Sequence, residues 1–205
     1  MRQAGRMAGV VAVLGMILTG VSGARRATPK ETVILAGGCF WGVEAVFEHV
    51  RGVTSVVSGY ATPAAPPSAE PSMRGGKGYA EAVRVKYDPS EVSYRQLLEI
   101  FFTVAHDPTQ LDRQGPDIGP EYRSAIFVQN EEQRQGALDY LEGLRAGASF
   151  PAPVVTEIAQ LKSFRQAEEL HQDYVRRHPK DQYVVVNDVP KLAELRRRFP
   201  ALYRD

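Results

Sequence analysis

The sequence predicts an α+β fold, a two-layer sandwich on a ferredoxin-like split βαβ core with a C-terminal extension. Between residues 32 and 128 two strand–helix–strand units follow one another, which is the order of that core. Right-handed crossovers place both helices on one face of the sheet. The 205 residues correspond to a single domain at about 150 residues per domain.

The first residues predict an export signal ahead of that domain. Arg2 and Arg6 precede an apolar run over residues 7–21, and Ser22-Gly23-Ala24 supplies the small residues of a cleavage site. The run is shorter than the roughly 20 residues of a membrane-spanning helix. We therefore expect residues 1–24 to be a cleaved signal peptide and the rest to be exported, in a bacterium to the periplasm. The alternative is a membrane anchor formed by the uncleaved segment.

The first predicted strand and helix meet at a tight turn. Residues 32–36 are a β-branched run that stops at Gly37-Gly38, as a buried strand does before a turn. From Cys39 the apolar spacing becomes helical, with one face formed by Val43, Val46, Phe47 and Val50. The pattern therefore places Cys39 at the start of a helix.

A strand, a long loop and another strand follow. Residues 53–60 predict a strand, and residues 61–78 hold four prolines and three glycines without apolar periodicity. Loops longer than about 12–15 residues are usually functional or disordered, so this loop is a candidate flap. Residues 80–87 alternate strictly, which predicts a half-buried strand with Glu81 on its inner face.

The remaining elements are predicted from caps and periodicity. Ser93 and Gln96 form a capping box before a helix that contains Leu97 and Val104. Residues 122–128 predict a fourth strand. Later elements are a helix capped by Asn130, a fifth strand at 154–159, helices at 164–178 and 191–199, and a strand at 183–186.

Composition excludes several classes of function. Lys and Arg total 25 against 24 Asp and Glu, a net charge of +1, so no basic excess exists to bind nucleic acid by counterion release. Cys39 is the single cysteine, which excludes an internal disulfide, a CxxC pair and a multi-cysteine zinc site. The spacing of the four histidines predicts no metal site and favours surface or capping roles for His49, His106, His171 and His178.

Cys39 is the first candidate for chemistry. Helix N-termini carry unpaired N–H groups and a partial positive charge, which stabilise a thiolate. Free cysteine is also a common buried residue, so a packing role is the alternative. The flanking glycines permit close approach of a substrate, and the aromatic pair Phe40-Trp41 can form a pocket wall. These neighbours favour a nucleophile.

Glu81 is the second candidate. A carboxyl group on the inner face of a strand is desolvated, which raises its pKa and lets it act as a general acid near neutral pH. The alternative is that the strand frays at Ala80 and leaves Glu81 in water.

Several motifs resemble one enzyme family. Residues 37–44, Gly-Gly-Cys-Phe-Trp-Gly-Val-Glu, are similar to the active-site signature of A-type peptide methionine sulfoxide reductases. Residues 78–83 resemble the family's Gly-His-Ala-Glu segment, and residues 106–110 its His-Asp-Pro segment. Residues 114–126 and 168–172 also fit, so that the resemblance covers residues 32–187. It implies that residues 25–205 form one catalytic domain.

The resemblance also implies a chemistry for the two candidates. Cys39 would attack the sulfur of methionine-S-sulfoxide, protein-bound or free, and Glu81 would bind and protonate the sulfoxide oxygen. The products would be methionine and a sulfenic acid on Cys39, the first step of cysteine oxidation. The enzyme would thereby repair oxidised exported proteins.

Further residues receive roles from the same resemblance. Tyr122 and Asp117 would hydrogen-bond around the sulfoxide oxygen, and Phe40 with Trp41 would hold the S-methyl group. Glu44 belongs to the signature but lies one helical turn inside, and we interpret it as a structural acid that favours the helix dipole.

Two departures from the family pattern bear on function. The loop at 61–78 lacks the tyrosine that relatives usually carry there, and Tyr79 stands where histidine is usual. Relatives often have resolving cysteines near the C-terminus, whereas this chain has none. The sulfenic acid would therefore need an external thiol, from a thioredoxin-like or glutaredoxin-like protein or a small molecule, and no bound cofactor is expected.

Two other functions remain open at this point. One is a Cys–His hydrolase that pairs Cys39 with a histidine. The other is a non-catalytic or weakly active exported relative that binds methionine-sized groups. The sequence leaves the preferred protein substrates and the oligomeric state undetermined.

Overall fold

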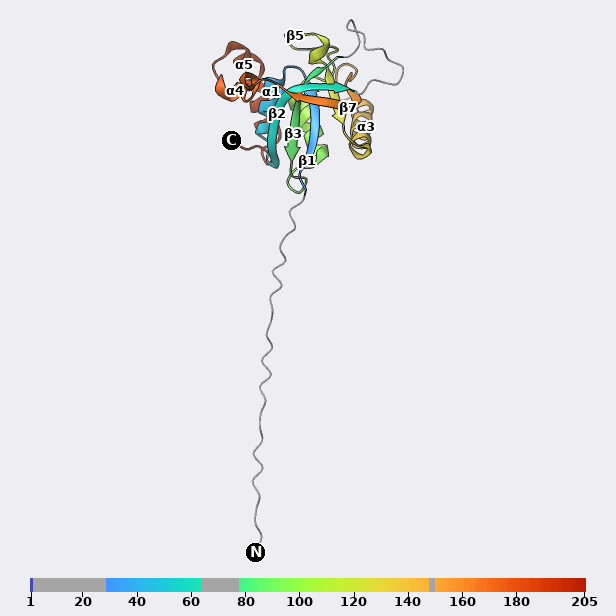
Figure 1. The fold of residues 1–205 in the computed structure, drawn as a ribbon, viewed down its shortest axis with the longest axis vertical. Coiled ribbons are helices and arrows are strands. Elements are labelled where there is room, and N and C mark those ends of the chain that lie inside the picture. Colours follow the sequence, from blue (N-terminus) through green and yellow to red (C-terminus); the bar gives the residue numbers. More distant parts are fainter. Residues whose placement is uncertain (2–28, 64–77, 148–149) are drawn as a thin grey trace.

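The computed structural model describes residues 29–63, 78–147 and 150–205, together with Met1. Its main sheet is a closed barrel of five strands (Figure 1), in the order β1 (Glu31–Gly37), β3 (Ala80–Tyr87), β2 (Val53–Pro63), β7 (Glu157–Gln166) and β6 (Ser124–Val128). Neighbouring strands are antiparallel except β6 and β7, which run parallel. A separate small hairpin joins β4 (Arg113–Gln114) to β5 (Asp117–Ile118).

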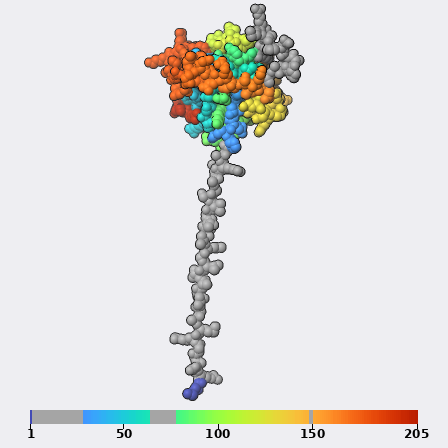
Figure 2. Space-filling view, in the orientation of Figure 1, coloured from blue at the N-terminus to red at the C-terminus, as the bar shows by residue number. Residues whose placement is uncertain are grey.

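Helices cover the barrel and build the C-terminal side of the molecule. The longer ones are α1 (Phe40–Glu48), α2 (Tyr94–Ile100), which continues into the π-helix η1 (Phe101–Ala105), α3 (Glu131–Ala146) and α6 (Val189–Arg198). The short ones are the 3-10 turns η2 (Pro120–Tyr122) and η3 (Glu169–His171), then α4 (Tyr174–Arg177) and α5 (Gln182–Asn187). Residues 167–205, which follow β7 and are called the C-terminal segment below, form the left side of the surface in Figure 2.

The α+β class is confirmed, but the closed sheet differs from the two-layer, ferredoxin-like sandwich that the sequence predicts. The physical reason is β7. It pairs with β2 on one side and with β6 on the other, so that the sheet has no free edge. An open two-layer sheet cannot form once this strand joins both of its ends.

The early elements confirm the sequence predictions. The strands at 32–36 and 80–87 and the helix after Cys39 form, and Ser93 and Gln96 make the capping box. Asn130 caps α3 by accepting a hydrogen bond from the backbone N–H of Gln133 at 2.8 Å.

The elements after residue 154 differ from the sequence predictions. The fifth strand begins at Glu157 and runs to Gln166. The predicted helix at 164–178 is wrong over residues 164–173, where Phe164 pairs with Ala61 of β2 and Glu169–His171 is a 3-10 turn, and α-helix forms only at Tyr174–Arg177. The predicted strand at 183–186 is helix α5, because Asp181 caps it through the N–H of Tyr183 at 2.8 Å and only Val184 of its valines is buried. Context here overrides the β propensity of a valine run.

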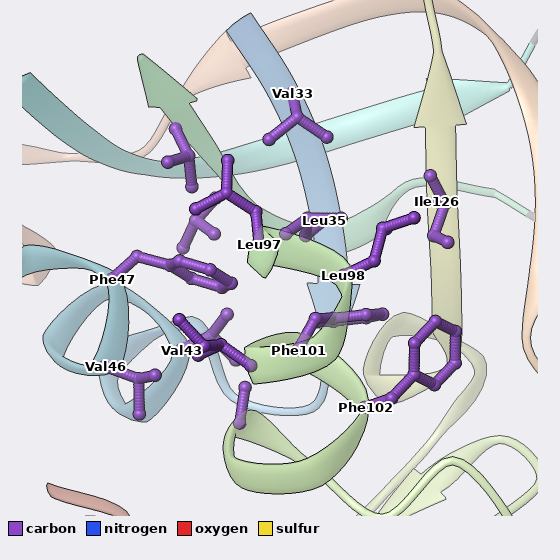
Figure 3. Close-up of a cluster of buried hydrophobic side chains, with 14 of the residues drawn as sticks. Val33, Leu35, Val43, Val46, Phe47, Leu97, Leu98, Phe101, Phe102 and Ile126 are labelled. Carbon is purple, nitrogen blue, oxygen red and sulfur yellow. The ribbon is translucent and has the colours of Figure 1, made fainter. Parts of the chain in front are cut away.

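The core lies between the sheet and the helices α1, α2 and η1. Figure 3 shows Phe47 of α1 and Leu97 and Phe101 of the next helix pointing toward the side chains of β1. The opposite face of the strands is lined by mostly small buried residues, Ile34, Ala36, Ala61, Ala80, Ala82, Ala125 and Phe127. Small side chains there let a five-stranded sheet close on itself.

Two predictions lie outside the described residues. They are the signal peptide at 1–24, apart from Met1, and residues 64–77 of the candidate flap. The described residues contain no helix with the length and hydropathy that a membrane crossing needs.

Candidate active site

Cys39 lies where β1 passes into α1, and its position depends on two glycines and a glutamine. Gly38 has a φ of +90°, and a Cβ there would lie 2.5 Å from the side chain of Gln114. Gln114 is itself fixed by two bonds to the backbone of Asp107, at 3.0 and 3.1 Å. Only glycine fits this turn. Cys39 follows as the N-cap residue of α1, and its side chain makes no capping bond.

The thiol of Cys39 is not the stabilised thiolate that the sequence predicts. Burial raises its pKa above the ordinary value, and the negative charges of Glu81, Asp188 and Asp117 raise it further. The backbone N–H of Trp41 lowers the pKa, but by less. The start of the helix thus lowers the pKa of Cys39, as the sequence predicts, but burial and the neighbouring carboxyl groups raise it by more. In the free site Cys39 therefore carries its proton at neutral pH.

Glu81 reaches the start of the same helix from β3. Its Oε2 accepts a hydrogen bond from the backbone N–H of Phe40 at 3.1 Å. Burial raises the pKa of Glu81 to about 7, while the Phe40 N–H lowers it and the charges of Asp117 and Glu121 raise it. The inward direction predicted from strand alternation is confirmed, and Ala80, which is fully buried, shows no fraying. Near pH 7 a large share of the Glu81 carboxyl is protonated.

Phe40 forms an aromatic wall together with two rings from other elements. It is buried, with a T-shaped contact to Tyr60 of β2 (ring centroids 5.7 Å apart) and a tilted one to His171 of η3 (5.4 Å). The hydroxyl of Tyr60 donates to Glu168 at 3.3 Å.

Trp41 is held by the C-terminal segment. Its indole stacks on Tyr174 of α4 at 3.6 Å between centroids and meets the edge of Tyr183 of α5 at 5.8 Å. Its Nε1–H donates to Nδ1 of His171 at 3.3 Å. Both predicted pocket-wall residues therefore lie in an aromatic cluster next to Cys39.

Asp117 and Tyr122 approach from the hairpin and the turn after it. The hydroxyl of Tyr183 donates to Oδ2 of Asp117, which ties β5 to α5. Tyr122 ends η2, and burial together with the charges of Glu81, Asp117 and Cys39 raises its pKa to about 12. Its phenol is therefore a hydrogen-bond donor at neutral pH. The structure thus brings all six predicted site residues into one region.

The sequence predictions missed several residues of this region. The sequence predicts no role for Tyr174 and Tyr183, and it predicts a surface or capping role for His171, which instead bonds to Trp41. The resemblance of residues 168–172 to the family is the sequence feature that could have indicated these residues. Tyr60 had no signal beyond its place in a strand.

The predicted structural role of Glu44 is confirmed, but the structure gives a different reason for it than the helix dipole. It is 2% exposed, and its carboxylate accepts from the backbone N–H groups of Ser58 at 3.3 Å and Asp173 at 2.9 Å. It therefore joins α1 to β2 and to the C-terminal segment, and does not serve mainly to offset the helix dipole.

Two of the histidines, His106 and His171, are held by partners other than Cys39. His106 is buried, with Nδ1 bonded to the carbonyl of Phe101 at 2.9 Å and Nε2 to the hydroxyl of Ser124 at 2.7 Å. Burial lowers its pKa to about 4, so that it is neutral. His171 accepts from Trp41. In these contacts neither ring pairs with the thiol, and within the described residues no group of His, Cys, Asp or Glu is arranged to hold a metal ion.

Comparison with known proteins gives consistent results. The profile of the family described as peptide methionine sulfoxide reductase matches residues 31–202. The chain is 48% identical to peptide methionine sulfoxide reductase MsrA 2 of Mesorhizobium japonicum over 182 residues, covering 88% of this chain and 93% of that protein. It is 47% identical to MsrA 2 of Synechocystis over 171 residues, covering 82% and 79%.

Solved structures show the same likeness. The reduced form of Mxr1 from Saccharomyces cerevisiae superposes with a TM-score of 0.61 at 30% identity, covering 74% of this chain and 87% of that one. Methionine sulfoxide reductase A of Corynebacterium diphtheriae superposes with a TM-score of 0.57 at 32% identity, covering 73% and 76%.

Proposed function

The chain belongs to the peptide methionine sulfoxide reductase family and reduces methionine-S-sulfoxide in peptides, and from this premise we propose that Cys39 and Glu81 carry out the reduction. The observation that carries the proposal is the 3.1 Å bond from the Phe40 N–H to Glu81. It places a carboxyl group with a pKa of about 7 one peptide unit from the only sulfur nucleophile of the chain.

The two groups share the proton transfers. Attack of the Cys39 sulfur on the sulfoxide sulfur drives electrons onto the oxygen, and protonated Glu81 donates its proton there. The thiol proton then restores Glu81. The attack forms a sulfur–sulfur bond. The S–O bond of the substrate then breaks and the hydroxide passes to the Cys39 sulfur, while the new sulfur–sulfur bond breaks with its electron pair left on the substrate sulfur. The products are methionine and a sulfenic acid on Cys39. A positioned acid of this kind contributes typically 10²–10⁴-fold.

The surrounding residues bind the two ends of the sulfoxide. Phe40 and Trp41 present apolar ring surface to the S-methyl group, and the Tyr122 hydroxyl donates to the oxygen. Asp117 takes part in the hydrogen bonds around the same oxygen. Tyr183 keeps the Asp117 carboxylate in place through its hydroxyl.

Regeneration of Cys39 requires a thiol from outside the chain. The sequence holds one cysteine, so the sulfenic acid cannot close an intramolecular disulfide. A first external thiol attacks it, releasing water and forming a mixed disulfide, and a second thiol of the same donor restores Cys39. A thioredoxin-like or glutaredoxin-like protein supplies both thiols, and no bound cofactor takes part.

The residues at 1–24 support export as part of the proposal. A basic start, an apolar run and small residues before a cleavage point are the features of a signal peptide. The substrates would then be oxidised proteins of the exported compartment, in a bacterium the periplasm. N-terminal sequencing of the secreted protein tests this point, and an intact Met1 would contradict it.

A burst experiment tests the mechanism. Without reductant, the chain should release one methionine per molecule from a blocked methionine-S-sulfoxide and then stop, because its single cysteine is consumed. Dimedone, which labels sulfenic acids, should then modify Cys39. The Cys39→Ser variant should release none. A burst that persists in this variant, or a continuing turnover without thiol, would contradict the proposal.

A further inference from the structure

Arg123 is a buried cation that the reduction does not use directly. It follows Tyr122 at the end of η2, and its side chain is 2% exposed. Burying a guanidinium removes it from water at a cost that its partners must offset. The place of those partners in the fold shows what this residue does.

The guanidinium binds three backbone carbonyls from two separate segments. Nη1 donates to the carbonyl of Pro120 at 2.7 Å and to that of Tyr79 at 3.2 Å. Nη2 donates to the carbonyl of Gly78 at 3.0 Å. Residues 78 and 79 lead into β3 directly ahead of Glu81, and Pro120 begins the turn that ends at Tyr122.

A third segment holds the guanidinium from the other side. Nε lies 3.6 Å from Oε2 of Glu157, at the first residue of β7. Since β7 closes the barrel, this ion pair fixes Arg123 to the sheet. Buried ion pairs often add little stability compared with apolar residues of similar volume. The three bonds of Arg123 to backbone carbonyls are therefore better explained by a role in positioning these backbone segments than by a gain in stability.

We propose that Arg123 is a positioning residue for the reduction, which fixes Glu81 and Tyr122 relative to each other by binding the backbone that carries each. The inference rests on the proposed function, because it assigns Arg123 to the placement of the acid and of the phenol that bind the sulfoxide oxygen. Displacement of a reacting group by 1 Å can cost about 100-fold in rate.

The variant Arg123→Lys tests the geometry while keeping the charge. An ammonium has no planar fork and cannot bind both segments in the same way. We expect the single-turnover rate of methionine release to fall by about 10- to 100-fold, with a smaller change in the apparent affinity for substrate. Thermal unfolding identifies a folding defect, and Arg134→Lys, an exposed pair with Glu131 on α3, is the matched control that should keep the wild-type rate.

A double-mutant cycle with Glu81→Gln separates positioning from general damage. If Arg123 acts through Glu81, Arg123→Lys should cost far less in the Glu81→Gln background than in the wild type. Equal losses in both backgrounds would overturn the inference and leave the role of Glu81 intact. If Glu81→Gln alone leaves the rate unchanged, the proposed role of Glu81 fails, and the inference fails with it.

A second variant covers the case in which Arg123→Lys does not fold. Glu157→Gln leaves the three carbonyl bonds of Arg123 in place and weakens the ion pair. The loss in rate should be smaller than for Arg123→Lys but should also shrink in the Glu81→Gln background. A loss that stays the same size in that background would overturn the inference.

Discussion

Two regions of the molecule are built in different ways. One is the end of the barrel where Cys39 lies, and the other is the C-terminal segment after β7. At this end of the barrel, strands in register place Glu81 and the end of β1, from which the turn to Cys39 begins. The C-terminal segment contains only short helices before α6. Side chains attach it to α1, and a short backbone bridge between Val50 and Tyr203 holds its end just beyond that helix. The sheet therefore sets the reacting groups, while the segment completes the pocket wall.

The attachment of the segment is polar as well as aromatic. Glu44 of α1 accepts from the N–H of Asp173, and Gln172 exchanges two bonds at 3.0 Å with the backbone of Ser58. Asp188, which is fully buried and paired with Lys191 at 3.3 Å, lies so close to Gly42 that a Cβ there would be 2.1 Å from it. The contacts of Glu44 and Gly42 tie the segment to the helix that presents Cys39, and those of Gln172 tie it to β2.

Glu81 and Glu44 represent the two regions. Burial raises the pKa of each to about 7, and each accepts backbone N–H groups. Glu81 faces the sulfoxide site, and Glu44 faces the joint between α1 and the segment. Variants of the two residues should therefore give opposite results.

The largest effect is expected for Glu81→Gln. The amide cannot donate a proton to the oxygen, so the single-turnover rate should fall by about 10²- to 10⁴-fold, with little change in the midpoint of thermal unfolding. Rapid-quench measurement of methionine release tests this. A rate within a factor of two of the wild type would remove Glu81 from the acid role.

The pH profile sharpens the same prediction. Since the reaction needs protonated Glu81, the single-turnover rate of the wild type should fall as pH rises through about 7. This limb should be absent in Glu81→Gln and present in Glu44→Gln. A limb that survives in Glu81→Gln would assign the titration to another group.

Glu44→Gln should change stability instead of chemistry. The amide offers one acceptor oxygen where the carboxylate offers two, so that its NH2 group must face the N–H of either Ser58 or Asp173. Loss of one of these bonds in a buried site costs about 1–3 kcal/mol. Chemical denaturation should show this loss, and the rate per folded molecule should stay near that of the wild type. Glu142→Gln on the exposed face of α3 is the control, with no loss expected.

The stability of the wild type should also depend on pH through Glu44. Its pKa in the folded chain, about 7, lies above the ordinary value of 4.5, so the folded state binds the proton more tightly. The resulting stabilisation is complete below pH 4.5 and is lost as pH rises toward 7. Glu44→Gln should reduce this decline between pH 5 and 7.5. An unchanged decline would show that other groups cause it.

The same contrast explains what the sequence could predict. The turn at Gly37-Gly38, α1 and β3 follow from local signals, because a strand alternation and a helical face are visible within a few residues. The end of β7 and the short helices are set by partners far along the chain, such as Ala61 opposite Phe164. The raised pKa of Cys39 also depends on burial that no local pattern shows.

The smallest effect is expected for Tyr183→Phe, which asks whether the C-terminal segment only packs against the site. The variant keeps the edge contact with Trp41 and loses the bond to Asp117. A lost hydrogen bond to a charged group is worth about 1.5 kcal/mol, which corresponds to roughly tenfold in kcat/KM. Tyr174→Phe is the matched control, because its hydroxyl points to Asp181 within the segment at 3.3 Å. If both variants keep the wild-type kcat/KM, the segment supplies a wall alone. If kcat/KM falls only in Tyr183→Phe, the segment places a polar group of the site. The barrel end would then not be the only region that positions such groups.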